Sequence, residues 1–303
     1  MVSNRHILRQ GSALGALGRT ALQAAMQKVQ GVPKTAPPLP GPELTSVVAP
    51  RPRDLVDAYL RNVGGNPKAY AGRLPGHMFP QWGFGPAART LDGIPYALMS
   101  VVNGGCRLEV RGELPDDVPL TVTAQLMDIE DDGRKAILRQ RVVTGVEGNP
   151  EIIVAHMDPI VIYGKRDKSQ PRPKKVMPTV PQDAHELARW RISRSAGLDF
   201  ARLTGDFNPI HWVPSYARMN GFKSTILHGF GTMARAIEGL HKAQFAGATP
   251  VRGFDCRFTR PLTLPADVGL YVRQTDALRE VWVGNALGGE CFMSGTYTLE
   301  GES

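Results

Sequence analysis

A short segment of the chain carries three polar side chains that together could hold a water molecule and move its proton. Asp206, Asn208 and His211 lie within six residues, around Pro209. The imidazole ionises near neutral pH, and the carboxylate can hold a water molecule or accept its proton. Pro209 fixes the backbone between the amide and the imidazole, so a turn of this kind can point both ionisable groups at one water. The segment therefore predicts a general acid–base pair for adding or removing water.

A second feature stands shortly after it, where His228-Gly229 opens an apolar helical run over residues 226–244. The first turn of a helix has unpaired N–H groups and a partial positive charge. Because glycine lets a ligand approach the backbone, the Gly229 N–H could bind a carbonyl oxygen that gains negative charge. We expect His228 to be a packed or capping side chain. Two simpler interpretations stay open: Gly229 as a close helix–sheet contact, and Asp206 or Asn208 as a helix cap.

The composition is typical of a soluble globular protein large enough for two domains. The 303 residues are 42% apolar and 21% charged, without an apolar run long enough for a transmembrane helix. Cys106, Cys256 and Cys291 lack metal-ligand or redox spacing, which predicts a reducing compartment, no disulfides and no metal site. The net charge of +8 comes without a long basic tract interleaved with aromatic residues. We therefore expect a solvated basic surface or a polyanionic small molecule, not nucleic acid, as its explanation.

The chain divides into four parts. Residues 1–52 read as an N-terminal helix and a proline-rich connector, and residues 165–184 as a proline-rich linker. Residues 1–30 contain arginine and no acid, so they predict either a helix docked on the body or an organelle transit peptide. Residues 53–164 and 185–303 both favour one helix followed by antiparallel strands with short turns. The repeated order indicates duplication, with an α+β fold in which each sheet wraps around a helix.

The elements expected within these two units follow from apolar patterning and turn-forming residues. In the first unit we expect a helix over residues 86–101 and strands over 106–111, 120–129, 136–143 and 152–163. In the second we expect a strand over 189–192, a helix over 226–244, and strands over 252–259, 268–275, 280–286 and 289–299.

The segment that carries the acid–base pair also resembles a known signature. Phe200-Ala-Arg-Leu-Thr-Gly-Asp-Phe-Asn-Pro-Ile-His211, with Gly221-Phe222 and Ile226-Leu-His-Gly229, is similar to the motif of MaoC-like (R)-specific enoyl-CoA hydratases and 3-hydroxyacyl dehydratases. The resemblance implies a double hot-dog protein, that is, two tandem hot-dog units with the first degenerate. The first unit has Pro86-Ala-Ala-Arg-Thr-Leu in place of the motif. We therefore expect one active site per chain, with the first unit helping to form an acyl tunnel.

The resemblance also implies an activity in fatty acid metabolism: reversible hydration of trans-2-enoyl thioesters to (R)-3-hydroxyacyl thioesters. Asp206 and His211 match the acid–base pair, Asn208 the motif amide, and Gly229 the oxyanion donor. No cofactor is implied, because coenzyme A enters only as part of the substrate, and the carrier is coenzyme A or an acyl carrier protein. Candidate phosphate ligands, each more often a surface charge, are Lys223, Arg252, Arg257 and Arg260. We expect a monomer or homodimer in the cytoplasm, or in an organelle matrix if residues 1–30 are a transit peptide.

Two other classes of function compete with this interpretation. A non-catalytic acyl-thioester-binding subunit would have no need for Asp206, Asn208 and His211 together. A hot-dog thioesterase would need a hydrolytic carboxylate on the central helix, and Glu238 is the only acid on the predicted one. Release of free thiol, as opposed to a change in enoyl absorbance, separates hydrolysis from hydration.

Overall fold

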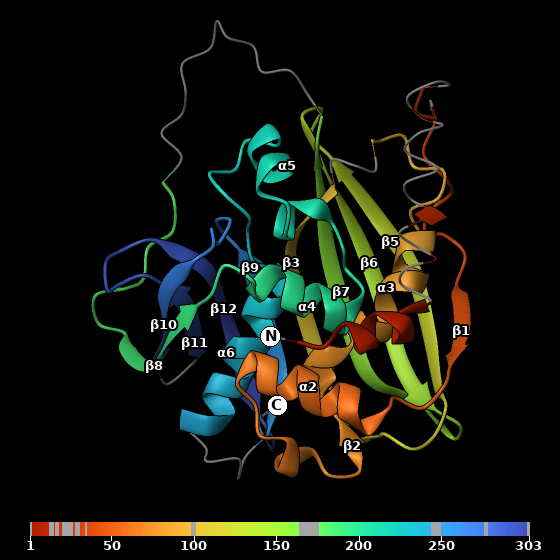
Figure 1. Cartoon of the computed structure of the whole chain (residues 1–303). Coiled ribbons are helices and arrows are strands. Elements are labelled where there is room, and N and C mark those ends of the chain that lie inside the picture. The colour runs from red at the N-terminus through yellow and green to blue at the C-terminus, as the bar shows by residue number, and fades with distance from the viewer. Residues whose placement is uncertain are drawn as a thin grey trace, which may run out of the picture.

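The computed structural model describes residues 2–11, 15, 18–19, 27, 31–33, 35–97, 101–163, 176–243, 250–275 and 278–301. Within these residues ten strands form one antiparallel sheet in the order β1-β5-β6-β7-β3-β9-β12-β11-β10-β8. Figure 1 shows the helices α2, α3, α4 and α6 together on one face of this sheet. Among the described residues, none of the helices combines the length and apolar character needed to cross a membrane.

The strands fall into two sets of five that follow the chain. The first set is β1 (Leu44–Val48), β3 (Val101–Val110), β5 (Leu120–Asp131), β6 (Lys135–Val146) and β7 (Asn149–Ile162). The second set is β8 (His185–Ile192), β9 (Val251–Phe258), β10 (Ala266–Gln274), β11 (Arg279–Gly284) and β12 (Cys291–Leu299). Two short strands, β2 (Arg73–Leu74) and β4 (Leu114–Pro115), pair separately.

The two sets meet at β3 and β9, and the order on one side of this joint mirrors the order on the other. Residues 105–109 of β3 pair with residues 253–257 of β9, and Cys106 lies opposite Cys256. Outward from the joint, β7, β6, β5 and β1 correspond in position to β12, β11, β10 and β8. The sheet therefore has an approximate two-fold arrangement about the β3–β9 pair.

The helical segments repeat in the same way. The first set is α2 (Arg53–Val63), η2 (Pro67–Tyr70), η3 (Gly76–Met78) and α3 (Pro80–Arg89). The second set is α4 (Ala196–Thr204), η5 (Pro209–His211), α5 (Pro214–Met219) and α6 (Gly229–Ala243). Both α2 and α4 end at a glycine with positive φ, 89° at Gly64 and 84° at Gly205. Only glycine adopts this left-handed cap without steric cost, so the sequence itself ends both helices.

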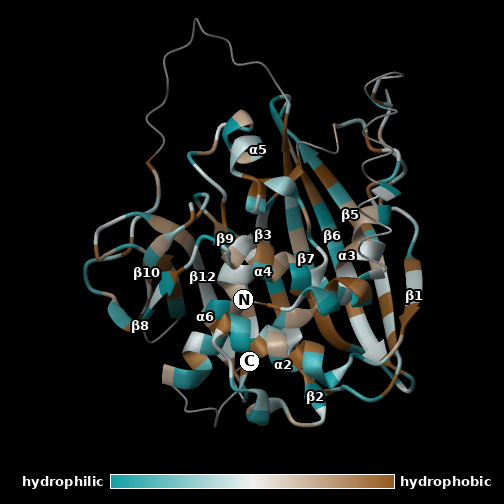
Figure 2. Ribbon diagram, in the orientation of Figure 1, coloured by the Kyte–Doolittle hydropathy of each residue, from teal (hydrophilic) through white to brown (hydrophobic). Residues whose placement is uncertain are grey.

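The core lies between the helices and the inner face of the sheet. Along β5, buried and half-buried residues alternate from Leu120 to Leu126, as a strand with one covered face requires. Figure 2 shows the corresponding alternation of brown and teal along the long strands. From the helices, Tyr59, Phe200 and Met233 are buried against this surface. The single apolar layer joins both halves, so it fixes the position of α6 relative to the first half.

Three expectations about the elements need correction. The first-unit helix covers Pro80–Arg89 and not residues 86–101, because the backbone turns at Gly93, whose φ is 81°. The proline-rich connector contains β1, which pairs with β5 through the register of Leu44 and Ala124. The end of the expected linker is packed, since Val180 is fully buried and Thr179 bridges to Glu290. The remaining predicted strands lie within, or overlap, the observed ones.

The N-terminal segment touches the body where it is described. A 3-10 helix, η1 (Asn4–Arg9), contacts α4, and the Val2 N–H donates to Asp199 Oδ1 at 3.0 Å. Arg9 pairs with Asp54 of α2. The rest of the helical pattern expected over residues 1–30 lies mostly outside the described residues. The described part is docked on α2 and α4.

Candidate active site

The turn that follows α4 is held by two local side-chain hydrogen bonds. Asp206 Oδ1 accepts from the Asn208 N–H at 3.3 Å, and Asn208 Oδ1 accepts from the Ile210 N–H at 3.2 Å. Asn208 is thus the N-cap of η5, as the simpler interpretation of the sequence proposed. The cap brings His211, at the end of η5, back toward Asp206. The two interpretations are compatible, because Asn208 caps η5 while the side chains of Asp206 and His211 can still contact a water molecule.

The His211 ring is held in one tautomer beside Asp206. The side chain is almost fully buried, and its Nδ1–H donates to the Ile226 carbonyl at 2.9 Å. The hydrogen bond places the proton on Nδ1 and leaves a lone pair on Nε2. Burial lowers the pKa of His211 below 6.5, although the charge of Asp206 partly opposes the shift. At neutral pH His211 therefore presents an unprotonated nitrogen, which is what a base requires.

His228 supports this pair and is itself a poor base. Its ring stacks on the His211 ring, with centroids 3.5 Å apart, and its Nε2–H donates to the Asp206 backbone carbonyl at 3.0 Å. Burial, together with the neighbouring His211, lowers the pKa of His228 to about 3. The side chain is therefore neutral and packed. The packed position expected for His228 is confirmed, and its hydrogen bond ties the start of α6 to the motif turn.

Asp206, His211 and His228 form one compact group. Their possible ligand atoms all lie within 4.8 Å of one another, a separation that one bridging water molecule can span. The Asp206 side chain is 25% exposed, so solvent has access to the carboxylate. The group also has the spacing of a metal site. Nε2 of His228 carries a proton toward a carbonyl, whereas its Nδ1 is buried without a hydrogen-bond partner among the described residues.

Gly197 in α4 makes room for His211, and sequence reasoning missed it. A Cβ at this position would lie 2.0 Å from the His211 carbonyl oxygen and 3.4 Å from its Cα. No side chain can occupy that space, so the glycine permits η5 to rest directly on α4. The only sequence signal is a glycine inside a helical pattern just before the motif, which indicates a close approach but not its partner.

Gly229 begins α6 directly after His228. A Cβ there would lie 2.7 Å from the ring of Phe258 in β9, so close packing alone requires glycine at this position. The helix–sheet interpretation is therefore sufficient for the residue type. The backbone N–H groups of the first turn of α6 still lie next to the His211–His228 pair, where a developing negative charge would be stabilised.

The four predicted cations lie in different places. Lys223 and Arg260 belong to two segments that pair beside the start of α6, through the Leu227 N–H to Leu262 O bond of 2.8 Å. Arg257 is exposed and alternates with buried Phe254 and Cys256 along β9, so it faces the side of the sheet away from α6. The structure thus does not place Arg257 at the motif.

Arg252 is also away from the motif. It lies at the opposite end of β9 from Phe258, where its Nε donates to Glu300 Oε1 at 3.1 Å. A strand of eight residues separates its two ends by about 23 Å, so Arg252 lies far from the start of α6.

Comparison with known sequences gives a family match for the second half. Residues 177–282 match the MaoC like domain. The chain is 29% identical to the peroxisomal enoyl-CoA hydratase 2 of Arabidopsis thaliana over 180 residues, covering 55% of this chain and 58% of that protein. It is 38% identical to 3-hydroxyacyl-thioester dehydratase X of Mycobacterium tuberculosis over 107 residues, covering 35% of each chain. The matched part thus spans about half or less of these relatives.

Comparison with solved structures covers both halves. The crystal structure of HtdX of Mycobacterium tuberculosis has a TM-score of 0.67 at 22% identity, covering 84% of this chain and 99% of that one. A MaoC-like dehydratase from Phytophthora capsici has a TM-score of 0.66 at 19% identity, covering 85% and 95%. These likenesses, together with the mirrored strand order, confirm the predicted α+β hot-dog architecture.

Proposed function

We propose that this chain, whose residues 177–282 form a MaoC-like domain, catalyses the reversible hydration of trans-2-enoyl thioesters to (R)-3-hydroxyacyl thioesters. The observation that carries the proposal is that Asp206 and His211 belong to one cluster, whose possible ligand atoms lie within 4.8 Å of one another beside the start of α6. The hydrogen bond from Nδ1–H to the Ile226 carbonyl leaves Nε2 of His211 unprotonated. The names of the relatives, an enoyl-CoA hydratase and a 3-hydroxyacyl-thioester dehydratase, support the same reaction class.

The geometry suggests how the reaction proceeds. Asp206 and His211 Nε2 hold one water molecule, and one of them takes its proton as the water oxygen bonds to C3 of the enoyl group. The electron pair of the double bond moves toward the thioester carbonyl, whose oxygen gains charge and is stabilised by N–H groups of the first turn of α6. A proton is then returned to C2. Because water and both proton carriers stand on one side of the substrate, the addition is syn.

The remaining parts of the proposal concern the carrier, cofactors, oligomeric state and location. The thioester is carried by coenzyme A or an acyl carrier protein, and the reaction needs no further cofactor. In this proposal its phosphate groups are bound by Lys223 and Arg260, whose segments pair beside the start of α6. Since one chain already contains both halves of the sheet, a monomer can be complete, and a homodimer of such chains is the alternative. We place the protein in the cytoplasm, with an organelle matrix as the alternative, because one relative is named peroxisomal.

The test is a hydration assay with crotonyl-CoA that follows the loss of enoyl absorbance. Asp206→Asn and His211→Ala should each lower kcat by roughly 10²–10⁴-fold, since each removes a proton-transfer group. Asp255→Asn and His185→Ala serve as matched controls, because both side chains are exposed and lie outside the motif. Wild-type rates in both motif variants would remove the mechanism.

The thioesterase alternative is tested in the same samples by measuring free thiol. Its candidate carboxylate, Glu238, is not at the motif: it is buried and bonded to His77 and Tyr70. Hydrolysis driven by Glu238 at the motif is therefore not supported by the geometry. Thiol release at the rate of enoyl loss would overturn the assignment to hydration.

A further inference from the structure

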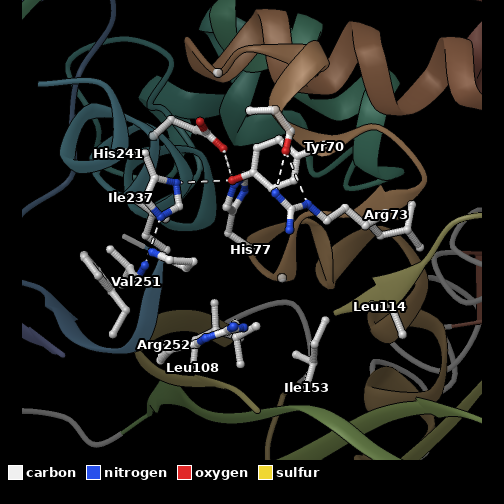
Figure 3. Close-up of a pocket in the computed structure, with 18 of the residues that line it drawn as sticks. Tyr70, Arg73, His77, Leu108, Leu114, Ile153, Ile237, His241, Val251 and Arg252 are labelled. Carbon is white, nitrogen blue, oxygen red and sulfur yellow. Dashed lines mark hydrogen bonds and ion pairs between the residues drawn. The ribbon is translucent and has the colours of Figure 1, made fainter. Parts of the chain in front are cut away.

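A cavity of about 580 Å³ lies at the C-terminal end of α6, and none of the motif residues lines it. Glu238, on its wall, stands nine residues after Gly229, which is about 13 Å along the helix. Figure 3 shows Tyr70, His77 and His241 turned toward one another on one side of this cavity, with Leu108 and Ile153 across from them. The cavity is thus a place distinct from the Asp206–His211 pair.

Its position mirrors that pair in the approximate two-fold arrangement. The helix α2 ends at Gly64, and Asn66-Pro67 then opens η2, just as α4 ends at Gly205 and Asn208-Pro209 opens η5. The Asn66 side chain even accepts from the Lys68 N–H at 3.1 Å, the same capping bond as in the second half. The expectation that Pro86-Ala-Ala-Arg-Thr-Leu replaces the motif is therefore wrong, because those residues lie at the end of α3 and beyond.

The mirrored turn has no acid or histidine of its own, but a carboxylate and an imidazole from other parts of the chain lie beside it. One residue, Gly65, separates Gly64 from the Asn-Pro pair, so no acid stands there, and Ala69 holds the position of His211. The carboxylate of Glu238, from the other half, lies where a side chain at Gly65 would be: a Cβ there would be 2.7 Å from its Oε2. His77, just before α3, pairs with Glu238 Oε1 at 2.8 Å.

Hydrogen bonds from three directions hold the Glu238 carboxylate and its neighbours in place. Tyr70 donates to Glu238 Oε1 at 2.7 Å, and His241 Nδ1–H approaches the Tyr70 oxygen at 3.2 Å. His241 takes this tautomer because its Nε2 accepts from the Val251 N–H at 3.1 Å. Burial raises the pKa of Glu238, but the hydrogen bonds from His77 and Tyr70 and the electrostatic attraction of His77 and His241 together outweigh it, so the pKa lies below its ordinary value. An ionised carboxylate and an imidazole thus stand together on a cavity wall.

The rest of the lining indicates what fits. The apolar part of the lining consists of Leu74, Leu108, Val110, Leu114, Ile153, Ile237 and Phe254. Three cations also line the cavity: Arg73, which pairs with Glu113 of the same lining, Lys242, and Arg252, which pairs with Glu300. The ligand must therefore be amphipathic, with an acyl part, a neutral polar group and an anionic head. A free fatty acid fits poorly, since its carboxylate would meet the charge of Glu238.

We propose that this cavity is a second acyl-thioester site, in which Glu238 and His77 take the places of the aspartate and histidine of the motif. The acyl chain lies on the apolar wall, the thioester faces Glu238 and His77, and the phosphates of coenzyme A meet Arg252 and its neighbouring cations. The choice of ligand class rests on the proposed function; the existence of the site rests on the cavity and the mirrored turn.

The experiment counts bound ligand by isothermal titration calorimetry with octanoyl-CoA, which is saturated and cannot be hydrated. The full-length wild-type chain should bind two molecules. Arg252→Glu should weaken one of these by tenfold or more, because it reverses the charge at the cavity mouth. Arg257→Glu, five residues along the same strand but on the outer face, should keep both. Glu238→Gln, which keeps size and removes charge, should also weaken one site.

Two results would overturn the proposal. One is a single octanoyl-CoA per wild-type chain. The other is an Arg252→Glu variant with unchanged octanoyl-CoA affinities and an altered acyl-length preference in hydration, since the cavity would then hold the tail of the substrate at the motif. Failure of the proposed function would give a different result: the wild-type chain would hydrate no enoyl-CoA but would still bind two molecules of octanoyl-CoA. Hydration with one molecule bound leaves that function standing and removes the second site.

Discussion

The substitution Gly197→Ala adds only one methyl group, but we expect it to displace His211 and so lower the hydration rate. The new Cβ would lie 2.0 Å from the His211 carbonyl oxygen, whereas a carbon–oxygen contact normally needs about 3.3 Å. The η5 segment must therefore retreat by about 1.3 Å. A displacement of about 1 Å in a catalytic group costs roughly 10²-fold in rate. We expect kcat/KM for crotonyl-CoA to fall about a hundredfold.

Stability should change much less than activity. Crowding costs about 1–3 kcal/mol, and the higher helix propensity of alanine returns about 1 kcal/mol. Urea unfolding followed by circular dichroism measures this change, and confirms that the variant is folded when its rate is taken. Gly11→Ala is the matched control, because no atom lies within 4 Å of its added Cβ. A folded Gly197→Ala chain with the wild-type rate would refute the reasoning about His211.

Three further predictions concern the same turn. Because burial holds the pKa of His211 below 6.5, the acid limb of the pH profile of kcat/KM should lie below pH 6.5; a limb above pH 7 would contradict this assignment. The pKa of His228 is about 3 in the folded chain and about 6.5 in the unfolded chain. Between pH 3 and pH 6.5 only the unfolded chain is protonated at His228, so the free energy of unfolding rises with pH in this range. On going from pH 6.5 to 5, the wild type should lose about 2 kcal/mol more than His228→Asn in urea unfolding, and equal losses would argue against a buried neutral ring. Asn208→Ala should cost about 1 kcal/mol and lower the hydration rate, whereas Asn66→Ala, the same cap in the mirrored turn, should cost about as much stability without that loss of rate.

The second half was well predicted from the sequence because local signals agree there. The helix expected over residues 226–244 is observed at Gly229–Ala243, and the strands match within a few residues. The motif turn was visible for the same reason: Asp206, Asn208 and His211 are polar residues at fixed spacing, and the structure brings their side chains together. Their catalytic roles remain predictions.

The first half was harder to predict because its turn kept the shape of the motif and lost its polar groups. Without an acid or an imidazole, Asn66-Pro67 reads like any other turn. The carboxylate that replaces them, Glu238, comes from a helix 172 residues later in the chain, and no local pattern connects the two. Gly197 was missed similarly, since the atom it makes room for belongs to another segment. Contacts of this kind depend on tertiary packing, and a single sequence does not contain a local signal for them.

Both halves of the sheet, which meet at β3 and β9, belong to one polypeptide chain, and this affects how such a protein can evolve. In an assembly of two identical subunits, every substitution would appear at both symmetry-related positions, so an acid introduced on the long helix would alter both reaction centres at once. Covalent fusion removes that constraint. Here Glu238 of α6 pairs with His77 beside the first turn, while Asp206, His211 and His228 cluster at the second, so the two turns hold different polar groups.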